Sequence, residues 1–512
     1  MPKRLLRILA VLLLVLLVII GVALSLFRYA SSMDPIEHLY ADNCAVCHGE
    51  QLEGLAQGPP LVGNRLVRGE SVSELIETIR AGAPARGMPA WGAVLSEDEI
   101  KSVALYVAER RSGRRFIDMR NDMPLVVPDG ILETQTHALR LETVAADLAP
   151  LPFSIAPMPN GDILLTEKTG GLVLVHPDGT RTEVRDSPRG FENSFELVSL
   201  GVGLGWLLDV ALHPDFAENG WIYVHFTERC EDCNPLGLTT SMNKLVRGRI
   251  RGGAWIDEET IWQADRDAYS VTPDLGAGGR LTFDPDGYVF MSIGMKGLSN
   301  YDGIQDLAMP YGKILRVHDD GRIPDDNPFV GTPGALPAIW SYGHRSPQGL
   351  EFDVQTGKLW ETEMGPRGGD EVNLIQPGRN YGWPLYSLGQ DYDGTPVEYG
   401  KNLGIEFDLA DIEQPIADFT PAPAISSFVI YDGDAFSSWR RSFLVGSLKG
   451  NELYRVVIEG DRHVSTEVLV RDLGRIRDVE VEAGGAILLL LEHDSGGQIV
   501  RMRPADGETR LD

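Results

Sequence analysis

The sequence has few cysteines and fewer basic than acidic residues. Over most of its length it also lacks the apolar periodicity that is typical of helices. Its four cysteines form two C-x-x-C pairs in different contexts, so each pair needs its own interpretation. Lysine and arginine total 46 against 74 acidic residues, and the net charge of −28 argues against nucleic acid or an anionic membrane surface as a partner. With 512 residues the chain is too long for one compact core, so we expect two or more domains.

One long apolar run extends from Ile8 to Phe27, after Lys3, Arg4 and Arg7. An apolar run of about 20 residues can cross a bilayer as a helix, and a basic N-terminal flank favours a cytoplasmic N-terminus. We therefore expect a single-pass anchor over residues 1–30 that leaves the rest of the chain on the periplasmic side of the inner membrane. A cleaved signal peptide is the alternative, although the run exceeds the usual length and no clean A-x-A follows it.

The first cysteine pair lies in a CAVCH run, the pattern of covalent haem attachment in which the histidine is an iron ligand. Zinc would need further Cys or His ligands nearby, and a redox disulfide would not need the histidine. Capping boxes that begin at Ser71 and Ser96 predict helices on either side of a methionine that suits the second axial position, for which Met33 is the only competitor. Residues 32–111 thus resemble a small all-α class I cytochrome c domain with one covalent haem c. Its expected haem-binding residues are Cys44, Cys47, His48 and Met88.

Residues 112–138 carry mixed charge and prolines without a sustained period, so we interpret them as a linker. Beyond them a strand–turn–strand pattern recurs roughly every 65 residues. No long helical run separates these strands, which argues against a parallel α/β fold. Residues 139–505 are therefore predicted to form an all-β propeller of six blades, with alternating strands packed face to face. The turn glycines are Gly161, Gly220, Gly287, Gly357 and Gly485, and the sixth unit has Trp439 near its turn.

Two motifs in this part have simple interpretations. The run from Gly201 to Gly205 lacks the spacing of a dinucleotide fingerprint and no helix pattern follows it, so we interpret it as a glycine loop. Cys230 and Cys233 have no following histidine, so they imply no second haem. In an exported protein they are expected to form a disulfide that staples a loop, with a pair of free thiols as the alternative.

The segment from Trp340 to Pro384 is dense in glycine, proline and charged residues, and binding sites tend to lie on such loops. The carbonyls of Gly365-Pro366 can face a hard cation such as calcium, and Arg345 can present a planar fork to an oxyanion. The GHRSPQGL and EMGPRGGDEVNLIQPGRNYGWP runs closely resemble those of the glucose/sorbosone dehydrogenase family, soluble aldose sugar dehydrogenases that use pyrroloquinoline quinone (PQQ) and calcium on a six-bladed propeller. The resemblance extends from about residue 139 to residue 504.

The resemblance implies a cofactor site. PQQ is a planar quinone with three carboxylates, so its pocket needs several fixed cations and a Lewis acid. By resemblance, Arg345 lies by the reactive quinone carbonyl and stabilises charge as hydride arrives. Gly365 and Pro366 would hold the PQQ-bound calcium through main-chain carbonyls, and Glu371, with the backbone near Tyr381, resembles a second, structural calcium site. The implied PQQ-binding residues are Arg345, Ser346, Lys449, Arg475 and Arg477.

The sequence departs from the family where the substrate is expected. The catalytic histidine of an H-x-x-G-R-L run is replaced by Gly276, and Leu204, Met295 and Ser346 replace polar residues that family members usually carry. Hydride transfer from an aldose needs a base that removes the hydroxyl proton, which glycine cannot do. We consider Asp274 as the substitute base; Asp209 and His344 are the other candidates.

The sequence as a whole predicts a membrane-anchored periplasmic quinohemoprotein dehydrogenase. It would oxidise an aldose or a related sugar or alcohol at PQQ and pass the electrons through haem c to a respiratory acceptor, a soluble cytochrome or terminal oxidase. The main alternative is a catalytically inactive propeller that binds a ligand or partner and is tethered to a cytochrome. A calcium-dependent, lactonase-like hydrolase would leave the predicted cations and the haem without a purpose.

Overall fold

The computed structural model describes residues 34–113, 124–191, 195–197, 200–296 and 301–505. The chain divides into two compact units, one built mainly from residues up to 116 and the other mainly from those that follow. The anchor predicted over Ile8–Phe27 lies outside the described residues. Within them, no helix has the length and apolar character that crossing a membrane requires.

The first unit is helical, as predicted. The capping boxes that begin at Ser71 and Ser96 are both present, with Glu74 and Glu99 at the third helical positions. The longest helix of this unit buries a continuous run from Ser102 to Glu109 in the core of the unit. The elements are α2 (Pro35–Asn43), α3 (Ala45–His48), α4 (Val72–Ala81), the 3₁₀ turn η1 (Pro84–Arg86) and α5 (Glu97–Arg111).

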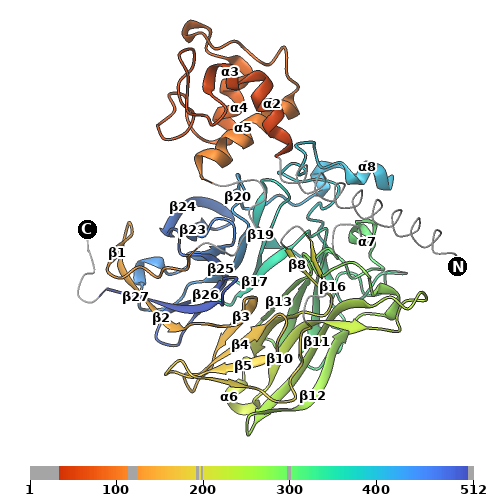
Figure 1. Ribbon diagram of the computed structural model, residues 1–512. Coiled ribbons are helices and arrows are strands. Elements are labelled where there is room, and N and C mark those ends of the chain that lie inside the picture. Colours follow the sequence, from red (N-terminus) through yellow and green to blue (C-terminus); the bar gives the residue numbers. More distant parts are fainter. Residues whose placement is uncertain (1–33, 114–123, 192–194, 198–199, 297–300, 506–512) are drawn as a thin grey trace, which may run out of the picture. The chain divides into compact units, whose positions relative to one another are not determined.

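The second unit is a six-bladed propeller, which confirms the predicted architecture (Figure 1). In chain order the blades contain β3 (Pro152–Pro157), β4 (Ile163–Glu167), β5 (Leu172–Val175) and β6 (Arg181–Glu183); β9 (Leu207–Leu212), β10 (Ile222–Cys230), β11 (Thr240–Arg251) and β12 (Ala254–Gln263); β13 (Gly278–Phe283), β14 (Tyr288–Ile293), β15 (Lys313–His318) and β16 (Ile339–Tyr342); β17 (Pro347–Asp353), β18 (Lys358–Glu363), β19 (Asp370–Ile375) and β20 (Ala417–Phe419); β21 (Ile425–Ile430), β22 (Phe443–Ser447), β23 (Leu453–Glu459) and β24 (Arg462–Val470); and β25 (Arg475–Val481), β26 (Ile487–Glu492) and β27 (Gln498–Pro504).

The propeller is closed by a strand from its own beginning. β2 (Ala138–Ala145) pairs antiparallel with β27, and β1 (Leu132–Glu133) pairs with β2, so the last blade joins both ends of the unit. This pairing closes the ring of blades, because the last blade contains strands from both ends of the unit. The remaining elements are short: the hairpin strands β7 (Phe195–Leu197) and β8 (Leu200–Val202), the helices α6 (Phe216–Asn219), α7 (Asp302–Gln305) and α8 (Tyr399–Leu403), and the 3₁₀ turns η2 (Arg266–Ala268), η3 (Leu409–Asp411) and η4 (Ser437–Trp439).

The two innermost strands of each blade are buried along most of their length rather than alternating, whereas outer strands such as β6 and β24 are largely exposed. β26 is buried along its whole length, and β4 is buried except at its last residue. The expected alternation fails because each blade has a neighbouring blade on both faces. Between β18 and β22, for example, the rings of Trp360 and Phe443 meet edge to face at 4.9 Å between centroids.

Candidate functional site

The inner strands converge at one end of the propeller, and the candidate site lies there. The inner strands β3, β9, β13, β17, β21 and β25 contact one another in this order around the ring, and β25 contacts β3. Each blade has the same antiparallel order, so every inner strand begins at the end of the ring where the second strand of its blade finishes. Residues that precede an inner strand, such as Arg345, therefore lie at the same end of the propeller as residues that follow a second strand, such as Lys168 and Gly365.

Three cations surround one carboxylate at this end. Arg477 Nε donates to Glu492 Oε1 at 2.6 Å, and Arg475 Nε donates to Glu492 Oε2 at 3.3 Å. Lys168 Nζ lies 3.6 Å from Glu492 Oε1, and the side chain of Glu492 is only 1% exposed. Burial alone would raise the pKa of Glu492, but the charges of Arg477, Lys168 and Arg475 hold that pKa well below its ordinary value. Among the described residues, Glu492 is the carboxylate that all three of these cations approach, and a cluster of this kind is suited to an anionic ligand.

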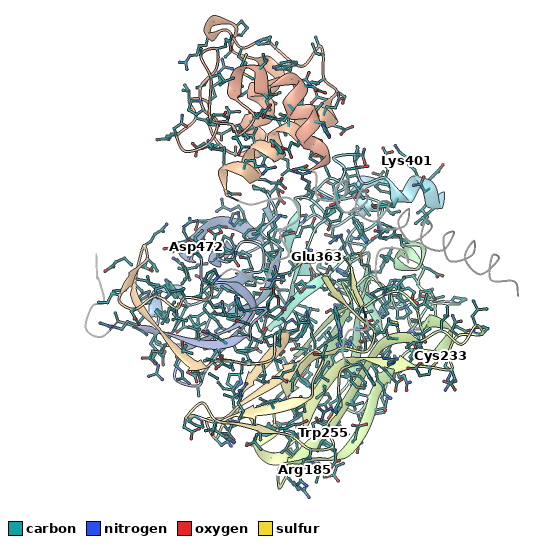
Figure 2. All side chains as sticks on the ribbon, viewed as in Figure 1. Arg185, Cys233, Trp255, Glu363, Lys401 and Asp472 are labelled. Atoms are coloured by element: carbon teal, nitrogen blue, oxygen red, sulfur yellow. A yellow bond between two sulfur atoms is a disulfide. The ribbon has the colours of Figure 1, made fainter. Side chains whose placement is uncertain are left out.

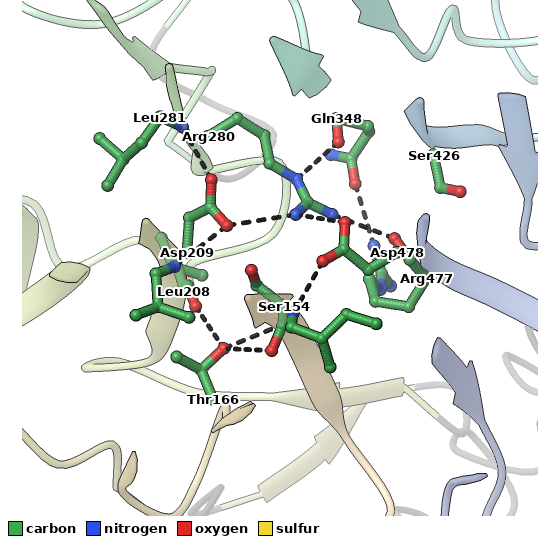
Figure 3. Close-up of polar contacts among 12 residues, drawn as sticks. Ser154, Thr166, Leu208, Asp209, Arg280, Leu281, Gln348, Ser426, Arg477 and Asp478 are labelled. Carbon is green, nitrogen blue, oxygen red and sulfur yellow. Dashed lines mark hydrogen bonds and ion pairs between the residues drawn. The ribbon is translucent and has the colours of Figure 1, made fainter. Parts of the chain in front are cut away.

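Gln348 links the cation cluster to the predicted substrate side. Its Oε1 accepts a hydrogen bond from Arg477 Nη1 at 3.0 Å, and its Nε2 donates to Ser346 Oγ at 3.1 Å. Figure 3 shows Gln348 and Arg477 beside Arg280, whose Nε donates to the Gln348 carbonyl at 2.7 Å and whose Nη1 pairs with Asp478 at 2.8 Å. The ends of β17 and β25 are therefore fixed to each other by charged hydrogen bonds.

Arg345 reaches the predicted calcium loop. Its Nη1 donates to the carbonyl of Met364 at 2.9 Å, next to Gly365. Asp370 holds the loop from the other side, because its carboxylate accepts hydrogen bonds from the backbone N–H groups of Gly365, at 3.0 Å, and Ile425, at 2.9 Å. Burial raises the pKa of Asp370 to about 6, while the charges of Lys449 and Arg345 oppose the shift. Lys449, Arg345 and Gly365 thus lie in the same neighbourhood, around Asp370.

A buried group of carboxylates lies behind Arg345. The strand register sets Glu361 opposite Asn373 and Glu363 opposite Glu371. Asn373 Nδ2 donates to Glu361, Glu363 and Glu371 at 3.1, 3.3 and 3.3 Å. Burial, with the negative charge of Glu363, raises the pKa values of Glu361 and Glu371 well above the ordinary value. Figure 2 places Glu363 inside the propeller.

This acidic cluster fits a hard cation. Within the described part of the chain, Glu361 Oε1, Asn373 Oδ1 and His344 Nδ1 are buried without a hydrogen-bond partner. Side-chain nitrogen and oxygen atoms of His344, Glu361 and Glu363 also lie within 4.8 Å of one another. Tyr381 stacks on His344 at 4.6 Å between ring centroids, and its hydroxyl donates to the Leu374 carbonyl, so only its backbone is available as a ligand. Oxygen donors of this kind are those that calcium prefers.

Three of the four departures from the family pattern, Gly276, Met295 and Ser346, meet at one point. A Cβ atom on Gly276 would lie 3.3 Å from the Cγ and Cε atoms of Met295 and 3.4 Å from Ser346 Oγ. Met295 is 4% exposed, and its N–H donates to the Arg345 carbonyl at 2.8 Å. Gly276 also has a φ of +73°, which disfavours a side chain there. Met295 therefore packs against the position from which a side chain at residue 276 would project.

Asp274 has the contacts of a structural residue rather than those of a base. Its Oδ2 accepts hydrogen bonds from the N–H of Gly205 at 2.7 Å and the hydroxyl of Thr227 at 2.6 Å. Its Oδ1 accepts from Ser241 Oγ at 2.8 Å and forms an ion pair with Lys296. The side chains of Asp274 and Lys296 are both essentially buried, at 0% and 1% exposure. The geometry gives this carboxylate four donors and no exposed surface, which disfavours the role that we considered from the sequence.

The other two candidate bases are also engaged. Asp209 forms an ion pair with Arg280 at 3.4 Å and accepts a hydrogen bond from the N–H of Leu281 at 2.8 Å. Both contacts belong to the hydrogen-bond network that Figure 3 draws. His344 is fully buried, and its Nε2 lies 2.9 Å from Ser341 Oγ. Neither side chain is presented to a substrate in the way that a general base requires.

In the helical unit, the geometry of His48 suits an iron ligand. His48 Nδ1 lies 2.8 Å from the carbonyl oxygen of Pro59, which can only accept, so Nδ1 carries the proton and Nε2 is left with its lone pair. Cys44 and Cys47 are free thiols on the same short segment. Met88 and Trp91 pack, half-buried, against the apolar core of this unit. The residues therefore fit the predicted covalent haem.

The second cysteine pair is a disulfide, as predicted. Cys230 and Cys233 are joined at the end of β10, in a loop at the edge of the propeller (Figure 2). Residues that the sequence analysis missed include Lys168, Gln348, Glu361, Glu363 and Asn373. The E-x-E pattern of β18 could have indicated two carboxylates on one face of a strand. No local pattern marks Lys168.

These features define a class of protein: a propeller oxidoreductase with an anion-binding cluster and a cation-binding cluster, joined in one chain to a cytochrome c domain. The family model for glucose/sorbosone dehydrogenases matches residues 149–501, and that for subunit III of cbb3-type cytochrome c oxidase matches residues 31–107. The chain belongs to the glucose/sorbosone dehydrogenase family and is a sugar dehydrogenase-like oxidoreductase.

Individual relatives agree with this assignment. The chain is 35% identical over 307 residues to the aldose sugar dehydrogenase YliI of Escherichia coli, covering 59% of this chain and 78% of that protein. It is 34% identical over 366 residues to the uncharacterized protein slr1608 of Synechocystis, covering 69% and 83%. The PQQ-bound aldose sugar dehydrogenase of Streptomyces coelicolor superposes with a TM-score of 0.52 at 26% identity, over 71% of this chain and 98% of that structure.

Proposed function

We propose that this protein is a PQQ- and calcium-dependent dehydrogenase of an aldose or a related sugar or alcohol that passes electrons through its own haem c. The carrying observation is the buried cluster of Arg475, Arg477 and Lys168 around Glu492, at the end of the propeller where Arg345 meets the Gly365 loop. A cluster with excess positive charge would otherwise be costly to bury. An anionic cofactor with several carboxylates satisfies it.

Each residue has a part in this proposal. Arg475, Arg477 and Lys449 hold carboxylates of the cofactor, and Ser346 with Gln348 orients the side nearest Gly276. The carbonyls of Gly365 and Pro366 hold calcium against the cofactor. When bound, PQQ supplies a two-electron acceptor, and covalent haem c supplies a one-electron carrier. Arg345, held by the Met364 carbonyl, stabilises negative charge that develops during oxidation. The remaining residues are Glu371 and the backbone of Tyr381, which with Glu361, Glu363 and Asn373 hold a structural calcium.

The electron route and location complete the proposal. In the helical unit, Cys44 and Cys47 would attach the haem and His48 and Met88 would bind its iron, and a soluble cytochrome or terminal oxidase would accept its electrons. The apolar run from Ile8 to Phe27 anchors the chain in the inner membrane with the propeller in the periplasm. A disulfide between Cys230 and Cys233 suits such an oxidising compartment.

The test uses the full-length chain, purified with haem and calcium but without PQQ. Under anaerobic conditions, aldoses and simple alcohols are added before and after PQQ, while the haem α-band is recorded. We expect reduction of the haem only when both PQQ and a substrate are present. A His48→Ala variant, which retains the propeller, should bind PQQ but lose the haem signal. If PQQ binds to the wild type and no compound reduces the haem, the dehydrogenase proposal is wrong.

A second candidate function is supported by the substrate side. Gly276 provides no base, Met295 packs against it, and Asp274 is held by four donors. A propeller that binds a ligand without oxidising it would have a substrate side of this kind, without an available base. This candidate predicts PQQ or ligand binding without any substrate-dependent change in the haem spectrum.

A further inference from the structure

Lys168 is a buried lysine whose position is fixed by its backbone. It follows β4, its N–H donates to the Leu151 carbonyl at 2.9 Å, and its own carbonyl accepts from the N–H of Leu207 at 3.0 Å. The segment is thereby tied to the starts of both β3 and β9. Its side chain is 9% exposed, with Nζ 5.5 Å from the ring centre of Phe153 and 5.0 Å from that of Trp206. Cation–π contacts with these rings stabilise the charged ammonium group only modestly, so they do not replace a full counter-charge.

The contact between Lys168 and its counter-charge is incomplete. Nζ lies 3.6 Å from Glu492 Oε1, whereas Arg477 already donates to the same oxygen at 2.6 Å. The charged groups that face Lys168 are Glu492 from β26 and Arg475 and Arg477 from β25; β3 and β9 present the uncharged rings of Phe153 and Trp206. Burial, and then the charge of Arg477, lowers the pKa of Lys168 to about 7. Of the two cations that approach Glu492 Oε1, Lys168 is therefore the more weakly neutralised.

We propose that Lys168 is a further binding residue for the anionic cofactor, and that it takes up a proton from solvent when the cofactor occupies the cluster. The inference rests on the proposed function, because it requires a cofactor that carries carboxylates. Added negative charge beside Arg475 and Arg477 provides the second counter-charge that Glu492 alone does not supply. That charge favours the protonated form of Lys168.

The direction of the pH effect follows from this linkage. Without cofactor, Lys168 is mostly protonated below pH 7 and mostly neutral above it. With cofactor bound, its pKa is raised, so binding is strongest below pH 7. The affinity then falls as pH rises, by up to about tenfold per pH unit, until the pKa of the bound form is reached. Near pH 8, binding should be accompanied by the uptake of about 0.5 to 1 proton.

The experiment is calorimetric titration of PQQ into the full-length, calcium-loaded, PQQ-free protein at pH 8, in buffers of different ionisation enthalpy. The slope of the binding enthalpy against buffer ionisation enthalpy gives the number of protons taken up. Lys168→Arg retains a permanent charge and should bind PQQ without this uptake. Lys168→Met removes the charge and should bind about 10- to 100-fold more weakly at pH 6.5, with little difference from the wild type at pH 9.

The outcomes separate this inference from the proposed function. PQQ binding to the wild type with no proton uptake at pH 8 overturns the role of Lys168 and leaves the proposed function intact. The same conclusion follows if Lys168→Arg takes up as many protons as the wild type, because another group would then titrate. Failure of the wild type to bind PQQ at all overturns the proposed function and this inference with it. Since Lys168 is largely neutral in the free protein at pH 8, methionine should be tolerated there without loss of folding.

Discussion

Around Glu492 three cations share one carboxylate, whereas around Asn373 three carboxylates share one amide and one histidine. Both clusters are buried, and both lie at the end of the propeller where inner strands begin and second strands end. A third buried group, Asp274 with Lys296, pairs one charge with one charge and fills its remaining acceptor positions with Gly205, Thr227 and Ser241. The comparison distinguishes charge that the fold balances internally from charge that a ligand must balance.

The cost of burial explains why this distinction matters. An isolated buried charge costs several kcal/mol, so an unbalanced buried cluster either binds an ion of opposite charge or changes its protonation. The cation cluster is suited to an anion, and the acidic cluster is suited to a divalent cation. The balanced pair needs neither and should contribute to stability regardless of ligands. The following predictions test these three cases in order of decreasing effect.

The balanced pair should give the largest loss of stability. Asp274→Asn leaves Lys296 buried without its counter-ion, so the free energy of unfolding should fall by about 3–5 kcal/mol, measured in denaturant. The loss should be the same with and without calcium or PQQ. Asp461→Asn, at a pair with 54% and 34% exposed side chains, is the matched control and should change stability by less than about 1 kcal/mol. A stable Asp274→Asn protein that reduces haem far more slowly would instead identify Asp274 as the base.

The acidic cluster should depend on calcium. Chelation should lower the free energy of unfolding of the wild type by about 2.7 kcal/mol relative to protein held at 100 times the dissociation constant. Glu361→Gln should remove most of this dependence, because it removes one carboxylate that has an unpartnered oxygen. Glu459→Gln, 69% exposed, should retain the full calcium effect. Equal stability of the wild type with calcium and with chelator would show that the cluster is neutralised by protons instead.

The cation cluster should depend on PQQ. Arg477→Met removes the donors to both Glu492 and Gln348, so the affinity for PQQ should fall by about 10- to 100-fold. Arg501→Met is a suitable control, since Arg501 also pairs with a glutamate, Glu482, but on β27 and away from the cluster. Its PQQ affinity, measured by calorimetry, should be unchanged. Equal losses in the two variants would contradict the assignment of the cluster.

Local signals in the sequence were sufficient for much of this architecture. The helices after Ser71 and Ser96 were predicted because capping is decided within one turn, and the hairpins of the propeller because their turn glycines recur. The cation cluster was predicted only in part. Arg475 and Arg477 stand in a recognisable run, but Lys168 reaches Glu492 only because β2 closes the ring and brings the first blade beside the last.

The substrate side shows a second limit of sequence reasoning. Gly276, Met295 and Ser346 were recognised separately as departures, and nothing in the sequence indicates that they touch. Asp274, which lies two residues before Gly276, was considered as the substitute base. Its side chain instead contacts Ser241 and Lys296, whose partnership depends on the packing of distant strands and loops. Proximity in sequence was a poor guide to the direction of a side chain in a loop.

The smallest expected effect concerns the contact between Gly276 and Met295. Gly276→His should lower the free energy of unfolding by about 1–2 kcal/mol for the positive φ, with a further loss because the new side chain meets Met295. Gly287→His isolates the first effect, since Gly287 has a φ of +82° and no neighbour within 4 Å of an added Cβ. The stability effect of Gly276→His should therefore depend on the side chain at residue 295, whereas that of Gly287→His should not.

A double-mutant cycle measures that coupling. Met295→Ala alone should be destabilising, because it leaves a cavity. Combined with Gly276→His, it should be less destabilising than the sum of the single changes by about 1 kcal/mol, whereas Gly287→His with Met295→Ala should be additive. Faster haem reduction by aldoses in the Gly276→His, Met295→Ala protein would show that the cofactor side is competent and that the missing base limits the rate. Additivity at residue 276 would mean that Met295 does not occupy the path of a side chain there, and the substrate side would then be open rather than filled.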